Sequence, residues 1–182
     1  MLVGKVLAFV GDGEGKTCAA MGHAIRAAGH GKKVAILQFL KGSDKTGEYK
    51  HLAGSNIDIR LVGDKTFVFD KAPKDIHIKK AKEGLAMANQ LIASGKYFLI
   101  VLDEILDAVA AGLMTMENLT ALIDTVRAIH ELPLQNQAAP HIILTGRILP
   151  PEISTKIDLI TQMKKIKHYY DRGEKGIEGL DW

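Results

Sequence analysis

The chain has 182 residues, of which 47% are hydrophobic, and a formal net charge of +3. This length is enough for one well-buried domain and too short for two, so we expect a single domain over residues 1–182. No apolar run approaches the roughly 18 residues that a membrane-spanning helix requires, and no cleavable signal pattern opens the chain. We therefore expect a cytoplasmic protein. The net charge decides little about partners by itself, and neither a membrane nor nucleic acid is expected as a partner.

Short apolar runs rich in valine, isoleucine and leucine recur along the chain between longer helical patterns. They lie at residues 5–10, 33–40, 97–104 and 141–146, and a weaker strand-like run covers residues 57–63. Nearly continuous apolar runs of this kind are typical of parallel strands that helices cover on both faces. An antiparallel sandwich would show alternating polar and apolar residues instead.

Amphipathic helical patterns separate these runs. The clearest covers residues 75–93 and another covers residues 116–130. Gly29 to Gly31 suits the end of an earlier helix, and Pro150 with Pro151 suits the opening turn of a later one. This order predicts an α/β fold with a mainly parallel sheet flanked by helices.

The glycine-rich segment from Gly11 to Cys18 follows the first predicted strand and leads into a helix. Glycines let the backbone curl with its amide hydrogens inward, and the helix N-terminus adds positive potential, so this context favours phosphate binding. Lys16 would add a full positive charge, and Thr17 would offer a hydroxyl to a magnesium ion. The usual spacing requires a glycine at position 10, where this chain has Val10, so the loop is one residue short.

Two acids, Asp12 and Glu14, stand inside this loop between Gly11, Gly13 and Gly15. A carboxylate about 5 Å from a phosphate charge costs roughly 3 kcal/mol at an effective dielectric constant of about 20, whereas helix-end attraction contributes about 1 kcal/mol. We therefore expect both acids to point away from the phosphates, or to meet the magnesium ion or a ribose hydroxyl. Cys18 either packs as a small side chain or adds a phosphate contact.

The run at 97–104 delivers Asp103 and Glu104 at its carboxyl end, the edge where open α/β sheets bind their ligands. Together with Thr17 they are candidates for magnesium coordination, with Glu104 preferred, although one acid could instead cap the next helix. Arg147 follows the run at 141–146 at the same edge, where it either holds phosphate or anchors a loop. These features predict a P-loop NTPase architecture of the RecA-like type.

The chain also resembles a known family, the ATP:corrinoid adenosyltransferases. The loop from Gly11 is similar to the family's own short form, G-[ND]-G-K-G-K-[ST]-[ST], and departs from it at Glu14 and Cys18. Further similar motifs follow in order over nearly the whole chain: RAAGHG at 26–31, QFLKG at 38–42, LDE at 102–104, LTGR at 144–147, PPE at 150–152, KHYYDRG at 167–173 and GLDW at 179–182.

The resemblance implies transfer of the 5′-deoxyadenosyl group of ATP to the cobalt of a reduced Co(I) corrinoid, with release of triphosphate. It implies Mg²⁺ as a cofactor, Lys16 at the leaving triphosphate and Arg26 among the nucleotide-binding residues. Phe67 and Phe69 match an aromatic pair that the family uses to remove an axial cobalt ligand, although the same spacing also fits two strand residues packed on one face. A homodimer and an electron donor such as a flavoprotein are further implications.

Two other functions are kept open by the sequence. A small P-loop NTPase or kinase would release ADP and phosphate, or phosphorylate an acceptor. A non-catalytic protein that binds ATP or a corrinoid would bind its ligand tightly without turnover, and Glu14 and Cys18 would then mark a loop that has lost its catalytic competence.

Overall fold

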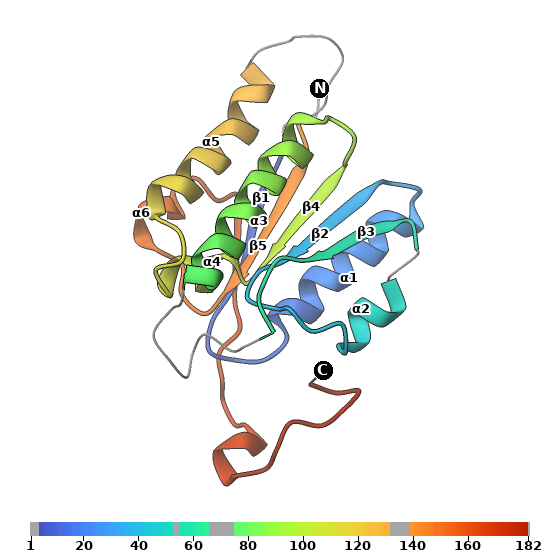
Figure 1. Cartoon of the computed structure of the whole chain (residues 1–182), viewed down its shortest axis with the longest axis vertical. Helices are drawn as coiled ribbons and strands as arrows, with labels where there is room; N and C mark the ends of the chain where they lie inside the picture. The colour runs from blue at the N-terminus through green and yellow to red at the C-terminus, as the bar shows by residue number, and fades with distance from the viewer. Residues whose placement is uncertain (1–3, 53–54, 66–74, 132–138, 182) are drawn as a thin grey trace.

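The computed structural model describes residues 4–52, 55–65, 75–131 and 139–181. Figure 1 shows a central sheet with helices packed on both of its faces. The elements, in chain order, are β1 (Val6–Val10), α1 (Lys16–Gly29), β2 (Val34–Gln38), α2 (Gly47–Leu52), β3 (Ile57–Leu61), α3 (Asp75–Ala93), β4 (Leu99–Asp103), α4 (Ile105–Ala110), α5 (Met116–Glu131), β5 (His141–Gly146), α6 (Pro151–Ser154), β6 (Leu159–Gln162) and the 3₁₀ helix η1 (Tyr169–Arg172).

The strands within the described ranges form one sheet in the order β3-β2-β4-β5-β1-β6, and every neighbouring pair is parallel. Parallel neighbours require crossover connections, which run through the helices. The carboxyl ends of the strands therefore meet at one edge of the sheet. Val10, Asp103 and Gly146 end the three strands β1, β4 and β5 there.

Two apolar clusters cover the two faces of this sheet. On one face, Ala20, Met21 and Ala24 of α1 pack against side chains of the strands. On the other face, the buried residues of α3, α4 and α5 form the larger cluster. Side chains of a strand alternate between faces, so strands that are covered on both sides need apolar residues at nearly every position. The buried sequences VAILQ and LIVLD of β2 and β4 meet that requirement.

The predicted α/β fold is confirmed. The four apolar runs form β1, β2, β4 and β5, the weaker run forms β3, and the clearest helical pattern forms α3 with the expected bounds. Four elements were not expected, namely α2, α4, β6 and the 3₁₀ helix η1. All four are short, and β6 lies at the sheet edge with every residue exposed, with only Leu159 and Ile160 as apolar residues. It therefore lacks the longer apolar run by which a buried strand is recognised. Among the described helices, none is long and apolar enough to span a membrane.

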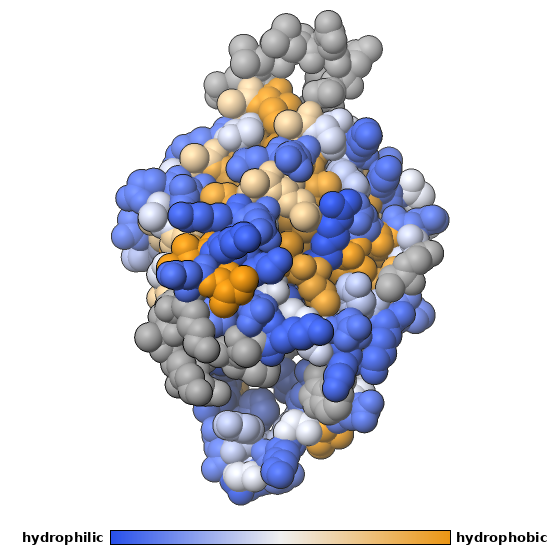
Figure 2. Space-filling model, in the orientation of Figure 1, coloured by the Kyte–Doolittle hydropathy of each residue, from blue (hydrophilic) through white to orange (hydrophobic). Residues whose placement is uncertain are grey.

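The segment from residue 163 to residue 181, here called the C-terminal segment, leaves β6 and runs past the loop that follows β1. The backbone N–H of Met163 donates to the Val10 carbonyl at 2.7 Å, and Gly13 N–H donates to the Met163 carbonyl at 2.8 Å. Farther along, the Tyr169 hydroxyl donates to the Asp181 carboxylate and closes the segment on itself. In Figure 1 the segment projects beyond the sheet and turns back toward α2. Figure 2 shows its visible face as mainly hydrophilic, so polar contacts position it rather than an apolar core.

Candidate nucleotide site

The loop between β1 and α1 depends on two glycines with left-handed backbone conformations. Gly11 has a φ of 121° and Gly15 a φ of 100°, which residues with a Cβ rarely adopt. A Cβ on Gly11 would also overlap the carbonyl oxygen of Met163, whereas one on Gly15, the N-cap residue of α1, would meet no described atom within 4 Å. Gly11 therefore permits the close approach of the C-terminal segment, and Gly15 leaves the start of α1 open.

Lys16 is the first residue of α1, and its ammonium turns back over the loop. The Nζ atom donates a hydrogen bond to the Gly13 carbonyl at 2.6 Å. Partial burial lowers the pKa of Lys16, although the nearby carboxylates of Asp107 and Glu104 oppose this shift. The positive end of the helix dipole lies at the same place, so the loop has a positive potential that favours an anion, and phosphate binding by the loop stays a prediction.

Asp103 is the buried centre of the site. Its Oδ1 atom accepts hydrogen bonds from the Thr17 hydroxyl at 3.0 Å and from the Thr145 hydroxyl at 2.7 Å. Its Oδ2 atom accepts from Gln38 Nε2 at 3.1 Å and from Lys41 Nζ at 3.0 Å. Because Asp103 is 0% exposed, these four donors replace the water that its carboxylate loses on folding. The acid is thus fixed beside Thr17 at the end of β4.

Glu104 follows Asp103 in a left-handed conformation, with a φ of 60° and a ψ of 18°, as the N-cap residue of α4. Its backbone N–H donates to the Thr145 hydroxyl at 2.7 Å. Burial raises the pKa of the Glu104 carboxyl to about 7, and the Lys41 ammonium, 3.7 Å from Oε1, limits the rise. The sequence left open that one of the two acids caps the next helix. Glu104 is the N-cap residue of α4 by position, but its side chain makes no capping hydrogen bond.

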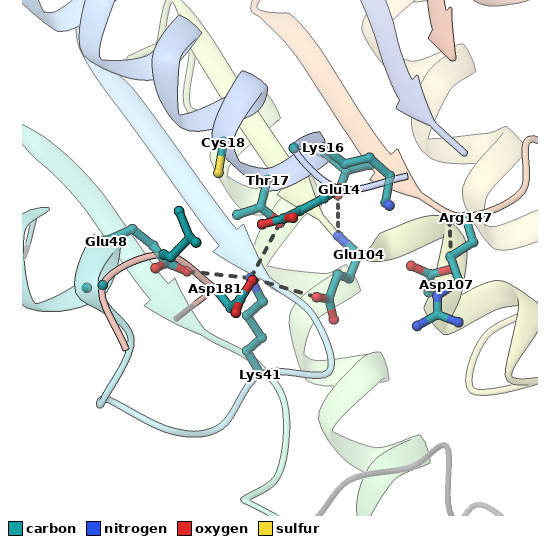
Figure 3. Close-up of a pocket in the computed structure, with 15 residues that line it drawn as sticks. Glu14, Lys16, Thr17, Cys18, Lys41, Glu48, Glu104, Asp107, Arg147 and Asp181 are labelled. Atoms are coloured by element: carbon teal, nitrogen blue, oxygen red, sulfur yellow. Dashed lines mark hydrogen bonds and ion pairs between the residues drawn. The ribbon is translucent and has the colours of Figure 1, made fainter. Parts of the chain in front are cut away.

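One cavity of about 630 Å³ unites the loop with the acidic end of β4. Figure 3 shows its labelled side chains converging from α1, from the segment after β2 and from the ends of β4 and β5. The C-terminal segment and the start of α2 also contribute to its lining. The lining residues are Glu14, Gly15, Lys16, Thr17, Cys18, Lys41, Gly47, Glu48, Glu104, Asp107, Thr145, Arg147, Gly179, Leu180 and Asp181.

Arg147 is both a loop anchor and a cavity residue. Its backbone N–H donates to Asp107 Oδ1 at 2.8 Å, and its carbonyl accepts from the Gly11 N–H at 3.0 Å. Its side chain lies at the cavity beside Asp107 (Figure 3). Burial raises the pKa of the Asp107 carboxyl, and the Arg147 contacts oppose this rise. The two roles that the sequence left open for Arg147 are therefore compatible, because the backbone anchors the loop while the guanidinium remains at the cavity.

The two loop acids face the C-terminal segment. Asp12 accepts a hydrogen bond from the Lys165 backbone N–H at 3.1 Å, and this bond lowers the pKa of its exposed carboxyl. The Glu14 Oε2 atom lies 3.6 Å from His168 Nε2. Asp12 lies outside the nucleotide cavity and lines an adjoining hollow, whereas Glu14 lines both. The expectation that these acids turn away from the phosphates therefore stays a prediction, with Asp12 bonded to the C-terminal segment and Glu14 at the cavity.

Cys18 and Arg26 differ from the expectations. Cys18 is exposed at the cavity, so its interpretation as a packed small side chain is wrong. Arg26 is exposed in the last turn of α1, roughly 15 Å from Lys16 along the axis at about 1.5 Å per residue, and is not among the described residues that line the cavity. A nucleotide contact by Arg26 therefore finds no support in this placement. Phe67 and Phe69 lie outside the described residues.

Sequence reasoning missed several side chains of the site. Lys41, Gln38 and Thr145 contact Asp103 directly, and Glu48 accepts from Gln38 at 3.1 Å. A signal for Gln38 and Thr145 existed, because each lies at or near the carboxyl end of a strand that neighbours β4. Polar residues at the carboxyl ends of adjacent parallel strands converge at one edge of the sheet. Gln38 and Thr145 could therefore have been predicted in the same way as Asp103.

The oxygen atoms of Thr17, Asp103 and Glu104 suit a magnesium ion that is shared with phosphate. Within the described residues, no group of three or more histidine, cysteine, aspartate or glutamate side chains is arranged to hold a metal alone. Magnesium in nucleotide sites typically takes one or two carboxylates and completes its shell with waters and phosphate oxygens. The Lys41 ammonium, surrounded by carboxylates, already shows that this position favours a cation.

The glycine-rich loop leads from a strand into a helix that begins with Lys16 and Thr17, and it faces the acidic end of a neighbouring strand. This arrangement is that of the P-loop NTPase-like α/β fold. The comparison with protein families is more specific. The family model described as ATP:corrinoid adenosyltransferase BtuR/CobO/CobP matches residues 3–182, and the chain belongs to that family.

Relatives from several bacteria agree with this assignment. The chain is 31% identical over 179 residues to a corrinoid adenosyltransferase of Escherichia coli K12, and the matched region covers 98% of this chain and 86% of the relative. It is 30% identical over 181 residues to one from Pseudomonas aeruginosa, with 98% and 84% covered. A third, from Salmonella typhimurium, is 27% identical over 179 residues, with 98% and 86% covered.

Proposed function

We propose that this protein transfers the 5′-deoxyadenosyl group of ATP to the cobalt of a Co(I) corrinoid and releases triphosphate. One observation carries the proposal: in a chain of the ATP:corrinoid adenosyltransferase family, Lys16, Thr17 and Arg147 share one cavity at the carboxyl edge of the sheet with the acidic end of β4. The loop would hold the triphosphate that leaves. It has no need to present a terminal phosphoryl group to an acceptor.

The reaction requires no nucleophile from the protein. The electron pair of Co(I) forms a bond to the ribose 5′-carbon, the bond from that carbon to the triphosphate oxygen breaks, and triphosphate departs with the electron pair. The protein has to align the two substrates and stabilise the charge that gathers on triphosphate. Lys16, Arg147 and the loop amides are suited to that task by position and charge.

Magnesium would be held by the oxygen atoms of Thr17, Asp103 and Glu104 together with phosphate oxygens. When bound, it neutralises part of the triphosphate charge. We further propose Phe67 and Phe69 as apolar contacts of the corrinoid that remove an axial cobalt ligand and so ease reduction. We also propose that the protein forms a homodimer. A flavoprotein as electron donor and a cytoplasmic location complete the proposal, because Co(I) requires a strongly reducing environment.

The decisive experiment is anaerobic incubation with ATP, Mg²⁺ and chemically reduced cobalamin. The adenosylated corrinoid spectrum and one triphosphate per turnover are expected. Lys16→Ala should reduce turnover by about 100-fold or more, because it removes a charge that stabilises the leaving group. Lys82→Ala, on the exposed surface of α3, is the matched control.

Other products would replace the proposal with one of the alternatives. Release of ADP with phosphate would indicate an NTPase or kinase. Tight binding of ATP and corrinoid without turnover would indicate a binding protein. Full activity in a folded Lys16→Ala variant would show that this loop does not carry the reaction.

A further inference from the structure

Lys41 places a positive charge among the oxygen atoms that were assigned to the metal. Its Nζ atom lies 3.0 Å from Asp103 Oδ2, 3.5 Å from the Thr17 hydroxyl oxygen and 3.7 Å from Glu104 Oε1. A fourth oxygen, Glu48 Oε1 of α2, lies at 3.5 Å. Figure 3 shows Lys41 among Thr17, Glu48 and Glu104, with dashed lines from its ammonium to the groups around it.

The backbone holds Lys41 firmly at this place. Leu40 adopts a left-handed conformation with a φ of 60°, and the Lys41 N–H donates to the Phe39 carbonyl at 2.7 Å. The Lys41 carbonyl in turn accepts from the Gly63 N–H at 3.0 Å. A Cβ on Gly63 would overlap the backbone of Leu40 and Lys41, so the two segments are in close contact. The Lys41 side chain is only 21% exposed, and its ammonium lies against the acids and away from solvent.

The same oxygen atoms cannot serve the ammonium and a magnesium ion at once. Magnesium binds oxygen at about 2.0–2.1 Å, whereas the ammonium already fills the space between Thr17, Asp103 and Glu104 at hydrogen-bond distances. Two cations in one small cluster would also repel each other strongly. Binding of the metal therefore requires Lys41 to move.

We propose that Lys41 is an internal cation of the nucleotide site, which occupies the metal position when no metal is bound and leaves it when the metal arrives with ATP. This inference rests on the metal position assigned under the proposed function. Lys41 is covalently tethered beside the acids, so free Mg²⁺ competes poorly with it. A metal that already carries phosphate ligands brings additional contacts and displaces it. The residue thereby couples metal binding to nucleotide binding.

The test measures binding of free Mn²⁺, a paramagnetic substitute for Mg²⁺, by electron paramagnetic resonance without nucleotide. Lys41→Met removes the charge and keeps much of the side-chain volume. This variant should bind Mn²⁺ at least about tenfold more tightly than the wild type. Its thermal unfolding temperature should fall without metal, because the buried acids lose their counter-charge, and should rise when Mn²⁺ is added. Lys45→Met, an exposed position on the same loop, is the control and should match the wild type.

Equal Mn²⁺ affinity in Lys41→Met and Lys45→Met would overturn the inference, as would tight binding of free Mn²⁺ by the wild type. If Lys41→Met does not fold, Lys41→Gln serves the same comparison, since its amide can still donate to Asp103. If neither variant folds, the wild-type titration decides: Mn²⁺ affinity must rise at least about tenfold when a non-hydrolysable ATP analogue is added. None of these measurements uses a corrinoid. If the variants differ in Mn²⁺ affinity as expected but the protein transfers no adenosyl group, only the proposed function is defeated.

Discussion

Glu14 and His168 face each other across the phosphate-binding loop, with 3.6 Å between Oε2 and Nε2. His168 Nδ1 accepts a hydrogen bond from the Tyr170 backbone N–H at 3.1 Å, so the neutral imidazole carries its hydrogen on Nε2, toward the carboxylate. Glu14 stands where the family motif that the loop resembles has lysine. In this protein the loop contacts the C-terminal segment through this acid.

Replacing Glu14 tests how much this acid opposes ATP. Glu14→Lys should tighten ATP binding, but by less than tenfold, because the wild-type side chain is 47% exposed and solvent screens its charge. Glu14→Gln, which removes the charge without reversing it, should give a smaller gain. Isothermal titration calorimetry at fixed ionic strength measures both. A gain far above tenfold would mean that the carboxylate lies against the phosphates, and an altered magnesium requirement would mean that it serves the metal.

Thr145 supports Asp103 at the end of β4 and the next residue, Glu104, and its loss should affect stability and metal-dependent binding together. The side chain is 1% exposed, donates to Asp103 Oδ1 and accepts from the Glu104 N–H. Thr145→Val keeps the shape and leaves the buried Glu104 N–H without its partner, which should lower the free energy of unfolding by about 1–3 kcal/mol. Urea unfolding measures this change, and MgATP affinity should fall as well. Thr125→Val on the exposed face of α5 is the control, and equal effects at the two positions would contradict the assignment.

Asp58 should make the stability of the fold sensitive to acid. Hydrogen bonds from Arg60 and Tyr97 hold the pKa of its carboxyl below the ordinary value of 3.8, although partial burial opposes them. A carboxyl whose pKa is lowered in the folded state contributes stability above its unfolded pKa, and this contribution disappears as the pH falls through the folded pKa.

The wild type should therefore be more stable than Asp58→Asn at pH 7, by up to about 1 kcal/mol, and the difference should shrink below pH 4. Urea unfolding at a series of pH values measures the difference. Asp44→Asn, at an exposed position, should show no such convergence. A constant difference between wild type and Asp58→Asn down to pH 2.5 would show that ionisation of Asp58 is not its cause.

The roles of Phe67 and Phe69 stay predictions, and their test separates reduction from transfer. Apolar rings that remove an axial cobalt ligand assist the formation of Co(I) and not its attack on ATP. Alanine at either position should reduce turnover when Co(II) corrinoid and a mild reductant are supplied, and should largely preserve it when Co(I) is prepared chemically. Equal losses in both assays would indicate general damage to corrinoid binding, and no loss in either would return the rings to a structural role.

Two kinds of element could be located from the sequence. They are the strands that helices cover on both faces and the long helices whose apolar residues repeat at helical spacing. β4 is predictable because a short, nearly continuous apolar run between longer helical patterns favours a strand that is covered on both faces. α3 is predictable because its apolar positions repeat at helical spacing. β6 has only four residues, all exposed, and its position depends on parallel pairing with β1, which is far away in the sequence. Pairing of that kind leaves no periodic signal.

The site was predictable where a motif fixes the chemistry and not where long-range contacts decide it. Lys16, Thr17 and Asp103 come together as the order of strands and helices requires. The position of Lys41 depends on the turn after β2 and its contact with Gly63, which the local sequence does not reveal. Likewise, the contact of Glu14 with the C-terminal segment joins residues 154 positions apart (168 − 14).

The two turns that carry Lys41 and Glu104 share a backbone feature with a further consequence. Of the described residues other than glycine, only Leu40 and Glu104 have a positive φ, 60° in both cases, and each lies just after a strand at the binding edge. Such a conformation disfavours any residue with a Cβ by about 1–2 kcal/mol. Glycine at position 104 would relieve this strain and remove the carboxylate. A laboratory selection for thermal stability alone should therefore favour replacements that remove this carboxylate, so the fold carries backbone strain at the position that holds the acid in the cavity.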